Sequence, residues 1–394
     1  MAARRGAAAP AGLLLALAAG CARPPGALGE ATLQALGRPG AYLTGEVTSL
    51  RREGPFEEGA LATAVSASRH AELVAFTALA GEDATLTAID RSGGSPHRLW
   101  VQRLNAGHRE VEAVEVSPDG SMIATAGRDG FLRTFRSRTG VPGAALGLRQ
   151  PLVSMAMRGD GAQLAVGTSQ GRVVVVAFPE LQLVASAELH GGQEVRGVAY
   201  RADGAILSGG WDRTVVLSRQ EGGDLREEKR RALQQYVNDV QVGGAAAAVA
   251  LSASPAERTP ELASRQRAPE EPAPANAVAL LDAATLDEVV RPVRHRGVVS
   301  TAAVAPDGLV FASGGWDGRV VVEQRDAPPQ RAPLEEGFDW LVRRVRVTRD
   351  ARFLLVAAWA RPAPSGQRAP PSILVEELVR PSPEVAREAP APRP

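Results

Sequence analysis

The sequence predicts an all-β fold in which short antiparallel strands are repeated along the chain. Three observations support this prediction. Apolar and polar residues alternate in many short runs, as they do in half-buried strands. The chain holds 41 glycines and 29 prolines, which suits many strands joined by tight turns. A short polar turn also recurs, each time between two apolar runs.

The recurring turn divides most of the chain into seven repeats. Its copies start at positions 68, 117, 158, 201, 242, 305 and 348, so successive starts are 49, 41, 43, 41, 63 and 43 residues apart. The 63-residue interval contains residues 252–274, a polar, proline-rich stretch that is unable to form a strand. Apolar runs flank this stretch on both sides. We therefore interpret 252–274 as a loop inserted within the fifth repeat.

The second repeat shows the order of strands within one unit. VEAVEV (111–116) alternates as an inner strand, and SMIATA (121–126) and FLRTF (131–135) follow it as the second and third strands. The Asp-Gly pairs between these runs match the positive φ that tight hairpins require. Thr139 and Gly140 then begin an outer strand. Each repeat is therefore expected to form four antiparallel strands.

Three stretches are similar in detail to a known repeat. AVEVSPDGSMIATAGRDGFLRTF, GVAYRADGAILSGGWDRTVVL and AAVAPDGLVFASGGWDGRVVV resemble WD repeats, each of which is about 40–45 residues long and forms one blade of a β-propeller. The resemblance implies a monomeric seven-bladed propeller of four-stranded antiparallel blades over residues 41–380. The seventh repeat lacks a fourth strand, because 381–394 is a proline-rich, disordered-looking tail. We expect residues 41–50 to close the ring as an N-terminal strand beside 372–378.

Histidine, serine or threonine, and aspartate recur at fixed spacing in the second, fourth and sixth repeats. The three sets are His108, Thr125 and Asp129; His190, Ser208 and Asp212; and His295, Ser313 and Asp317. They resemble the hydrogen-bonded set that ties together the strands of a WD blade, although the tryptophan that completes the set in the family is absent. The resemblance implies that these residues are structural.

The same residue types could suggest a hydrolase or a metal site. Three copies in separate repeats indicate a repeated structural part rather than one catalytic triad. The one GxSxG match, residues 167–171, joins two β-like runs and not the strand and helix of a nucleophile elbow. No two histidines share a short ligand spacing, and Cys21 is the only cysteine. The sequence therefore predicts no catalytic residues, no metal and no cofactor.

The N-terminus predicts export and lipid anchoring. Arg4 and Arg5 precede an apolar run at 11–19 that is too short to span a bilayer. LAAGC (17–21) resembles the lipobox of bacterial lipoproteins, which implies that residues 1–20 are a signal peptide and that Cys21 is lipidated. Residues 21–40 would then be a flexible tether, because they hold two proline and glycine clusters. The alternative is an ordinary cleaved signal with an incidental cysteine. By the same resemblance to lipoproteins, Ala22 after Cys21 implies sorting to the outer membrane, facing the periplasm.

The expected function is a non-enzymatic scaffold, anchored by lipid to the bacterial cell envelope, that binds a protein or peptide. A formal net charge of +1 does not suggest a nucleic-acid partner. The alternatives are a structural subunit of an outer-membrane assembly machine and a propeller enzyme of the quinoprotein or lactonase type. In WD propellers the residue before the turn aspartate lies on one face of the ring. Arg128, Trp211 and Trp316 hold that position and are the candidate partner-binding residues, since tryptophan and arginine are enriched at interface hot spots.

Overall fold

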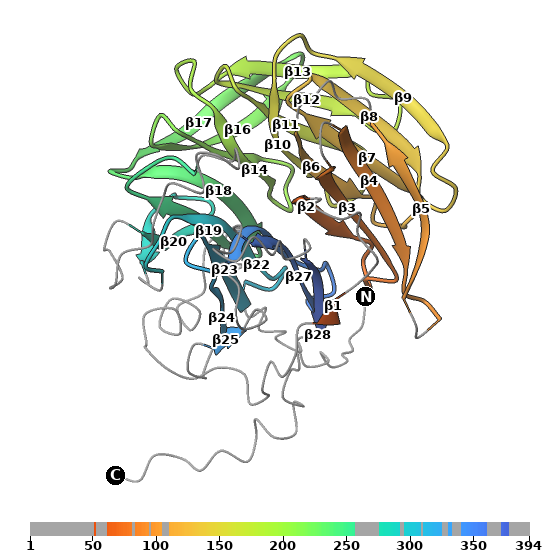
Figure 1. Ribbon diagram of the computed structural model, residues 1–394. Helices are drawn as coiled ribbons and strands as arrows, with labels where there is room; N and C mark the ends of the chain where they lie inside the picture. Colours follow the sequence, from red (N-terminus) through yellow and green to blue (C-terminus); the bar gives the residue numbers. More distant parts are fainter. Residues whose placement is uncertain are drawn as a thin grey trace, which may run out of the picture.

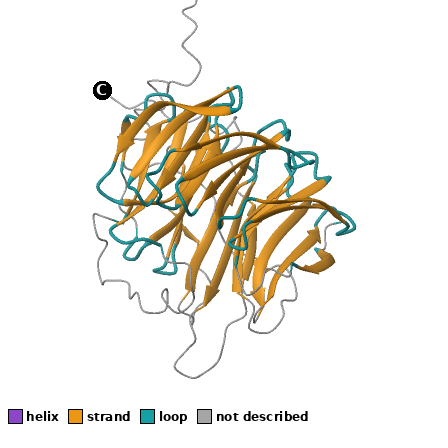
Figure 2. Ribbon diagram, turned by 90° about the horizontal axis from the view of Figure 1, so that it is seen from above, coloured by secondary structure: helices purple, strands orange, loops and turns teal. Residues whose placement is uncertain are grey.

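The computed structural model describes residues 51–52, 61–80, 83–93, 96–104, 110–256, 276–291, 295–308, 310–324, 330–332, 340–360 and 372–377. Within these ranges the chain forms strands and turns and no helix, as Figure 2 shows. The all-β class that the sequence predicts is thus confirmed. The predicted signal peptide, Cys21, the tether at 21–40, the strand at 41–50 and the tail at 381–394 lie outside the described residues.

The strands form five sheets of four strands and one sheet of eight, and neighbouring strands in each group of four are antiparallel. The first two groups are β2 (Leu61–Ala67), β3 (Leu73–Ala80), β4 (Asp83–Asp90) and β5 (His97–Arg103), then β6 (Val111–Val116), β7 (Met122–Gly127), β8 (Phe131–Arg136) and β9 (Pro142–Gly147). The eight-stranded sheet consists of β10 (Leu152–Met157), β11 (Gln163–Thr168), β12 (Arg172–Ala177) and β13 (Leu183–Glu188), with β14 (Val195–Tyr200), β15 (Ile206–Gly210), β16 (Thr214–Glu221) and β17 (Asp224–Ala232). Its halves are joined by one parallel bridge between Ser186 and Asp224.

The remaining strands form three more groups of four. They are β18 (Tyr236–Gly243), β19 (Ala246–Ser252), β20 (Ala277–Asp282) and β21 (Glu288–Val290); β22 (Val299–Val304), β23 (Val310–Gly315), β24 (Val320–Gln324) and β25 (Gln330–Ala332); and β26 (Trp340–Val347), β27 (Phe353–Ala360), β28 (Ser372–Glu377) and β1 (Arg51–Arg52). Strand β1 pairs with β28, through Arg51 opposite Val375 and Arg52 opposite Leu374. The chain thus supplies one strand of its last sheet from its N-terminal side, directly after the predicted strand at 41–50.

The recurring polar turns join the first and second strands of each group, as the sequence predicts. Gly120 and Gly308 adopt φ of 72° there, which glycine tolerates without steric cost. Ala71 and Ala351 occupy the equivalent position in the first and last groups with φ of 54° and 57°. These two turns keep the left-handed backbone without the glycine that ends the copies starting at 117, 158, 201 and 305.

The sheets are arranged about a common centre, with the first strand of each group nearest to it (Figure 1). Each first strand lies beside the next in the order β2, β6, β10, β14, β18, β22 and β26, and β26 in turn lies beside β2. Apolar side chains fill the space between neighbouring sheets. Leu73 and Leu86, for example, pack against Val114 and Ile123 of the following sheet. The arrangement is that of a β-propeller.

Two further features position the site. The core between the first and last sheets contains Val74 and Phe76 on β3 together with Leu355 on β27 and Val375 on β28, so the two ends of the chain share one core. In the fifth repeat, β19 and β20 pair directly, with Leu251 opposite Ala277. The predicted insertion therefore connects two paired strands of one sheet, although most of it lies outside the described residues.

Candidate functional site

Two of the three His–Ser/Thr–Asp sets are brought together as hydrogen-bonded triads. His190 precedes β14 and lies with Nε2 2.8 Å from Ser208 Oγ on β15 and Nδ1 2.9 Å from Asp212 Oδ1. His295 repeats this geometry, with 2.8 Å to Ser313 Oγ and 3.0 Å to Asp317 Oδ1. Both imidazoles are fully buried. Each triad links the loop before a first strand to the second strand and to the turn that follows it.

The third set is placed only in part. His108 lies outside the described residues, so its contact with Thr125 and Asp129 is not seen. Asp129 forms an ion pair of 2.6 Å with Arg133, and its Oδ1 accepts a hydrogen bond from the Phe131 backbone N–H. It therefore caps the turn between β7 and β8, the position that Asp212 and Asp317 occupy in their own sheets.

The triads hold their aspartates in the charged form. Burial raises the pKa of Asp212, but the hydrogen bond from His190 and the hydrogen bonds from Thr214 outweigh it, and the pKa lies below its usual range. Asp317 behaves in the same way, with Arg296 and Arg319 supplying backbone hydrogen bonds. An aspartate that is held as an anion by turn amides fixes local structure.

The other sequence motifs take ordinary structural positions. Residues 167–171 form the hairpin between β11 and β12, with Gly167 opposite Val173, and no helix follows them. Among the described residues, no three His, Cys, Asp or Glu side chains are grouped so that they could hold a metal ion. The described part of the chain also contains no helix long and apolar enough to cross a membrane.

The three candidate partner-binding residues have different surroundings. Trp316 is only 2% exposed and packs with Val298, Leu341 and Trp359, so its expected role at a partner surface is wrong. Trp211 is half-buried, and Arg128 has a side chain that is 29% exposed. These two belong to a polar network that the sequence analysis did not anticipate.

The network begins with a β-bulge that recurs at one position of every first strand. In each of these strands one residue is skipped in the pairing with the second strand. A bulge of this kind re-aims a side chain, and bulges are common next to functional sites. The skipped residues are Thr63, Glu112, Val153, Arg196, Asn238, Ser300 and Arg343, and we call them the bulge residues. All seven are buried, and six are polar or charged.

Several polar groups at or beside the bulges link one first strand to the next. Thr63 Oγ1 donates to the Val111 carbonyl at 2.7 Å, Asn238 Nδ2 donates to the Val299 carbonyl at 2.9 Å, and Ser300 Oγ donates to the Val342 carbonyl at 2.5 Å. Ser154, next to a bulge, donates to the Val195 carbonyl at 2.6 Å. These buried hydrogen bonds between neighbouring groups of four strands stabilise the centre, since an unpaired buried polar group is costly.

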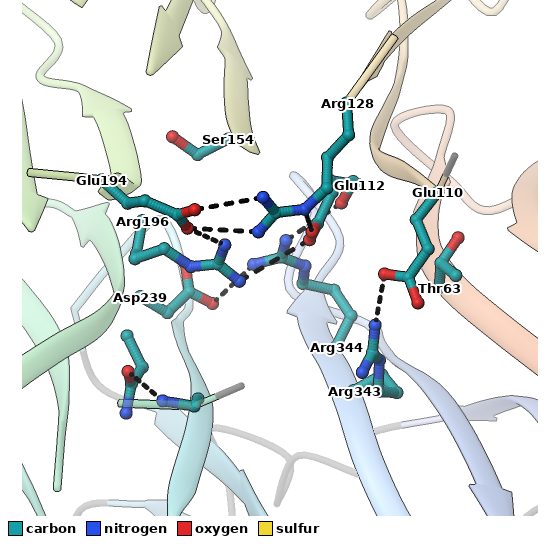
Figure 3. A network of polar contacts seen from close by, with 12 residues as sticks. Thr63, Glu110, Glu112, Arg128, Ser154, Glu194, Arg196, Asp239, Arg343 and Arg344 are labelled. Carbon is teal, nitrogen blue, oxygen red and sulfur yellow. Dashed lines mark hydrogen bonds and ion pairs between the residues drawn. The ribbon is translucent and has the colours of Figure 1, made fainter. Parts of the chain in front are cut away.

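Charged bulge residues gather at the end of the centre where the first strands begin (Figure 3). Arg128 Nε donates to Glu112 at 2.7 Å, and its two terminal nitrogens donate to the Glu194 carboxylate at 3.0 and 3.2 Å. Arg196 donates to Glu194 at 2.6 Å and stacks over the Trp211 ring at 5.0 Å. Burial raises the pKa of Glu194, but Arg196 and Arg128 bring it below its usual range. Arg128 and Trp211 are therefore held in place by neighbours within the protein.

Further along the centre, Asp239 on β18 is fully buried between two arginines of β26. It lies 3.3 Å from Arg344 and 2.9 Å from Arg346, and it accepts a hydrogen bond of 2.7 Å from Thr301. Burial raises the pKa of Asp239, but Arg346 and Arg344 hold it below its usual range. Ion pairs that bridge β18 to β26 cross the centre, because these strands belong to sheets that are not neighbours.

A cavity of about 680 Å³ opens at the opposite end, where the first strands finish. We call it the mouth cavity. All seven first strands, or the turns that follow them, contribute to its wall, including Ser66, Glu115, Met157, Tyr200, Gln241, Val304 and Arg346. It is a candidate ligand site, because pockets of a few hundred Å³ with converging polar groups are typical binding sites.

Sequence reasoning missed the polar centre and the mouth cavity. Their signal was present as charged residues inside otherwise apolar first strands, such as Glu112 and Glu115 in VEAVEV, Asp239 in YVNDVQVG and the arginines of WLVRRVRV. A charge in a strand that is buried on both sides needs a partner. Arg346 and its partner Asp239, for example, are more than a hundred residues apart in the sequence, so spacing alone could not pair them.

Three segments of the chain match the WD40 family, described as WD domain, G-beta repeat: residues 100–135, 182–217 and 289–322. Each match starts in the last strand of one sheet, or just before it, and runs into the third strand of the next sheet. The three matches contain the three His–Ser/Thr–Asp sets. They are the second, fourth and sixth repeats, in which the sequence resemblance is strongest.

Proposed function

The chain belongs to the WD40-repeat proteins, and we propose that it is a non-enzymatic scaffold that binds a protein or peptide partner at the bacterial cell envelope. WD40 repeats generally serve protein interaction, which supports the first half of this proposal. The observation that supports it most within the molecule is the mouth cavity. A pocket walled by every first strand, on a centre cross-linked by buried hydrogen bonds, is a preorganised receptor, and preorganisation lowers the entropic cost of binding.

The scaffold is proposed to be a closed ring of seven blades. The order in which the first strands lie beside one another, from β2 round to β26 and back to β2, supports a ring. The groups of four strands support seven blades, if the eight-stranded sheet counts as two. The pairing of β1 with β28 supports closure from the N-terminal side, and 41–50 is proposed to extend that strand.

Lipid anchoring on Cys21 is proposed from the sequence alone. After cleavage the mature chain would begin at Cys21, and two or more acyl chains give stable membrane attachment whereas one is marginal. Replacement Cys21→Ala should move the protein into the soluble envelope fraction or leave it unprocessed. Intact mass of the mature protein measures the modification directly, and a free Cys21 thiol would contradict the proposal.

Affinity capture tests the binding function. The full-length, C-terminally tagged chain is expressed in its own cells, the envelope is solubilised in mild detergent, and co-purifying proteins are identified by mass spectrometry. The matched control carries residues 1–40 fused to an unrelated soluble domain, so that it shares the anchor but not the scaffold. We expect one or a few proteins enriched with the full chain alone. Equal capture by both chains would contradict the proposal.

A further inference from the structure

The mouth cavity has more positive than negative side chains. Its charged wall consists of Arg69, Arg158, Arg201, Arg346 and Arg349 with Glu115, Asp160 and Asp203. Five guanidinium groups thus face three carboxyls. The balance decides what kind of ligand the cavity favours, because a cleft with an excess of one charge concentrates ligands of the opposite charge.

Two of these arginines are neutralised within their own turns. Arg158 contacts Asp160 through Nε at 2.9 and 3.0 Å and through a terminal nitrogen at 2.7 Å. Arg201 lies 3.4 Å from Asp203. These pairs occupy the rim contributed by the third and fourth repeats, and they leave Arg69, Arg346 and Arg349 facing Glu115.

Of the remaining three arginines, Arg346 forms an ion pair with Asp239. Arg349 forms no ion pair with a carboxylate of the described residues. Among the described residues, its terminal nitrogens donate to the backbone carbonyls of Gly159, at 3.3 Å, and Met157, at 3.5 Å. No carboxylate of the described residues lies within 4.0 Å of the Arg349 or Arg69 guanidinium. Burial lowers the pKa of Arg349; Arg69 lowers it further, while Glu115 and Asp160 partly offset this. Two like charges therefore share one wall of the cavity.

Glu115 and Tyr200 lie beside the two arginines on the cavity wall. Burial raises the pKa of Glu115, although Arg349 and Arg346 lower it. Tyr200 also lines the cavity, but its hydroxyl is buried away from the cavity surface and has no hydrogen-bond partner among the described residues. Burial also raises the pKa of Tyr200, which keeps the hydroxyl protonated. The guanidinium groups of Arg349 and Arg69 are therefore the charged donors that an acceptor ligand in the cavity would meet.

We propose that the mouth cavity binds a carboxylate of an acidic peptide segment, held by Arg349 and Arg69. Guanidinium groups match the planar carboxylate through paired hydrogen bonds. The volume of about 680 Å³ admits a few peptide residues and no folded domain. The inference rests on the proposed binding function and names the chemistry that the partner presents. The carboxylate is either an aspartate or glutamate side chain or the C-terminus of the partner.

Isothermal titration calorimetry on the full soluble ring, with Cys21→Ala, tests the proposal. The first probe is a hexapeptide of Gly, Asp and Glu with acetylated and amidated ends, and its matched control has Asn and Gln instead. A third peptide has no acidic side chain but a free C-terminus. Binding of the first or of the third peptide, with none for the amide control, supports the proposal and identifies the source of the carboxylate. Absence of heat from both acidic probes at millimolar concentration overturns it, as does tighter binding of inorganic phosphate.

Matched variants test whether peptide binding depends on Arg349 itself or only on the overall charge of the protein. Arg349→Gln is expected to weaken binding of the acidic peptide about ten-fold or more, the scale of a lost charged hydrogen bond. Arg226→Gln makes the same charge change on the exposed outer strand β17, where the side chain is 72% exposed, and should leave affinity unchanged. Equal weakening by the two variants would overturn the proposal. Arg349→Gln should also leave the melting temperature unchanged or raise it, because that guanidinium has only long contacts.

The same variant distinguishes this inference from the proposed function. If the wild-type chain captures a partner from the envelope and Arg349→Gln captures it equally well, the carboxylate site is refuted while the scaffold function stands. If the wild-type chain captures nothing that the anchor control does not, the scaffold function itself is refuted.

Discussion

At the scale of single residues, the buried triads are expected to stabilise the fold. Asp212 accepts hydrogen bonds from His190 and from Thr214 in a partly dry site. Asp212→Ala should lower the free energy of unfolding by roughly 2–3 kcal/mol, the scale for a charged hydrogen bond and its orphaned partner. Urea denaturation measures this, with Asp287→Ala as control because the Asp287 side chain is 79% exposed. An unchanged unfolding free energy, together with the loss of a measured catalytic activity, would reverse the structural assignment.

The same aspartate predicts a pH dependence. The pKa of Asp212 in the folded chain lies below its value in the unfolded chain, which is about 3.9. Its contribution is therefore fully present above about pH 4 and is lost as pH falls through the lower, folded pKa. Between pH 5 and the acid unfolding transition, the wild-type protein should lose more stability than Asp212→Ala. Parallel loss in both proteins would show that Asp212 is not part of this linkage.

Asp239 is expected to be the more sensitive carboxylate. Asp239→Asn keeps the shape of the side chain but leaves Arg344 and Arg346 without the negative charge between them. Removing one partner of a buried ion pair costs about 3–5 kcal/mol, because the remaining charge stays desolvated. Thermal unfolding of this variant beside the exposed Asp287→Asn control measures the difference. Similar melting temperatures for the two variants would mean that water already solvates the centre.

At the scale of elements, the strands and turns were more predictable than the site. Alternation and Asp-Gly turns predict most first, second and third strands, because hairpin geometry is local. The triads were also predictable, since His190 and Asp212 recur with the spacing of His295 and Asp317. The bulges were not, because a bulge shows only in the register between two strands. The same holds for Trp316, whose burial depends on Leu341 and Trp359 in the next sheet.

The pairing of β19 with β20 gives a prediction for the inserted loop. Residues 257–275 should be replaceable by a short Gly/Ser linker with little change in melting temperature. Loop closure depends only weakly on length, at about 0.6 kcal/mol for each doubling. The deletion keeps Ala256, which is buried and whose N–H donates to Asn238 at 3.0 Å. Scanning calorimetry of the two chains measures the change, and a failure to fold would show that the insertion is part of the core.

At the scale of the whole molecule, the proposed closed ring would account for how the first and last sheets support one another. The core shared by the first and last sheets and the β1–β28 pairing both connect residues that are about three hundred positions apart. A chain that starts at residue 53 should therefore melt at a markedly lower temperature than one that starts at residue 41. A chain that starts at residue 22 serves as control and should match the latter. Equal melting of all three would contradict closure from the N-terminal side.

The two ends of the centre differ in how their charged side chains are paired. The end with Glu112, Arg128 and Glu194 is closed by its own ion pairs and holds the sheets together. The other end leaves Arg349 and Arg69 facing the mouth cavity. Sites that bind ligands commonly retain such uncompensated groups at some cost in stability. We therefore propose that the partner binds at the mouth cavity, and not on the face predicted from Arg128, Trp211 and Trp316.

Photo-cross-linking in the native cell tests that placement most directly. The photoreactive residue p-benzoylphenylalanine replaces Ala202, which is exposed on the wall of the mouth cavity, or Arg226 on the outer strand β17 as control. After irradiation, mass spectrometry identifies the adducts of each chain. We expect a defined partner joined through an acidic segment to position 202 and absent from position 226. No adduct at position 202, or the same adducts at both positions, would contradict a binding site at the mouth cavity.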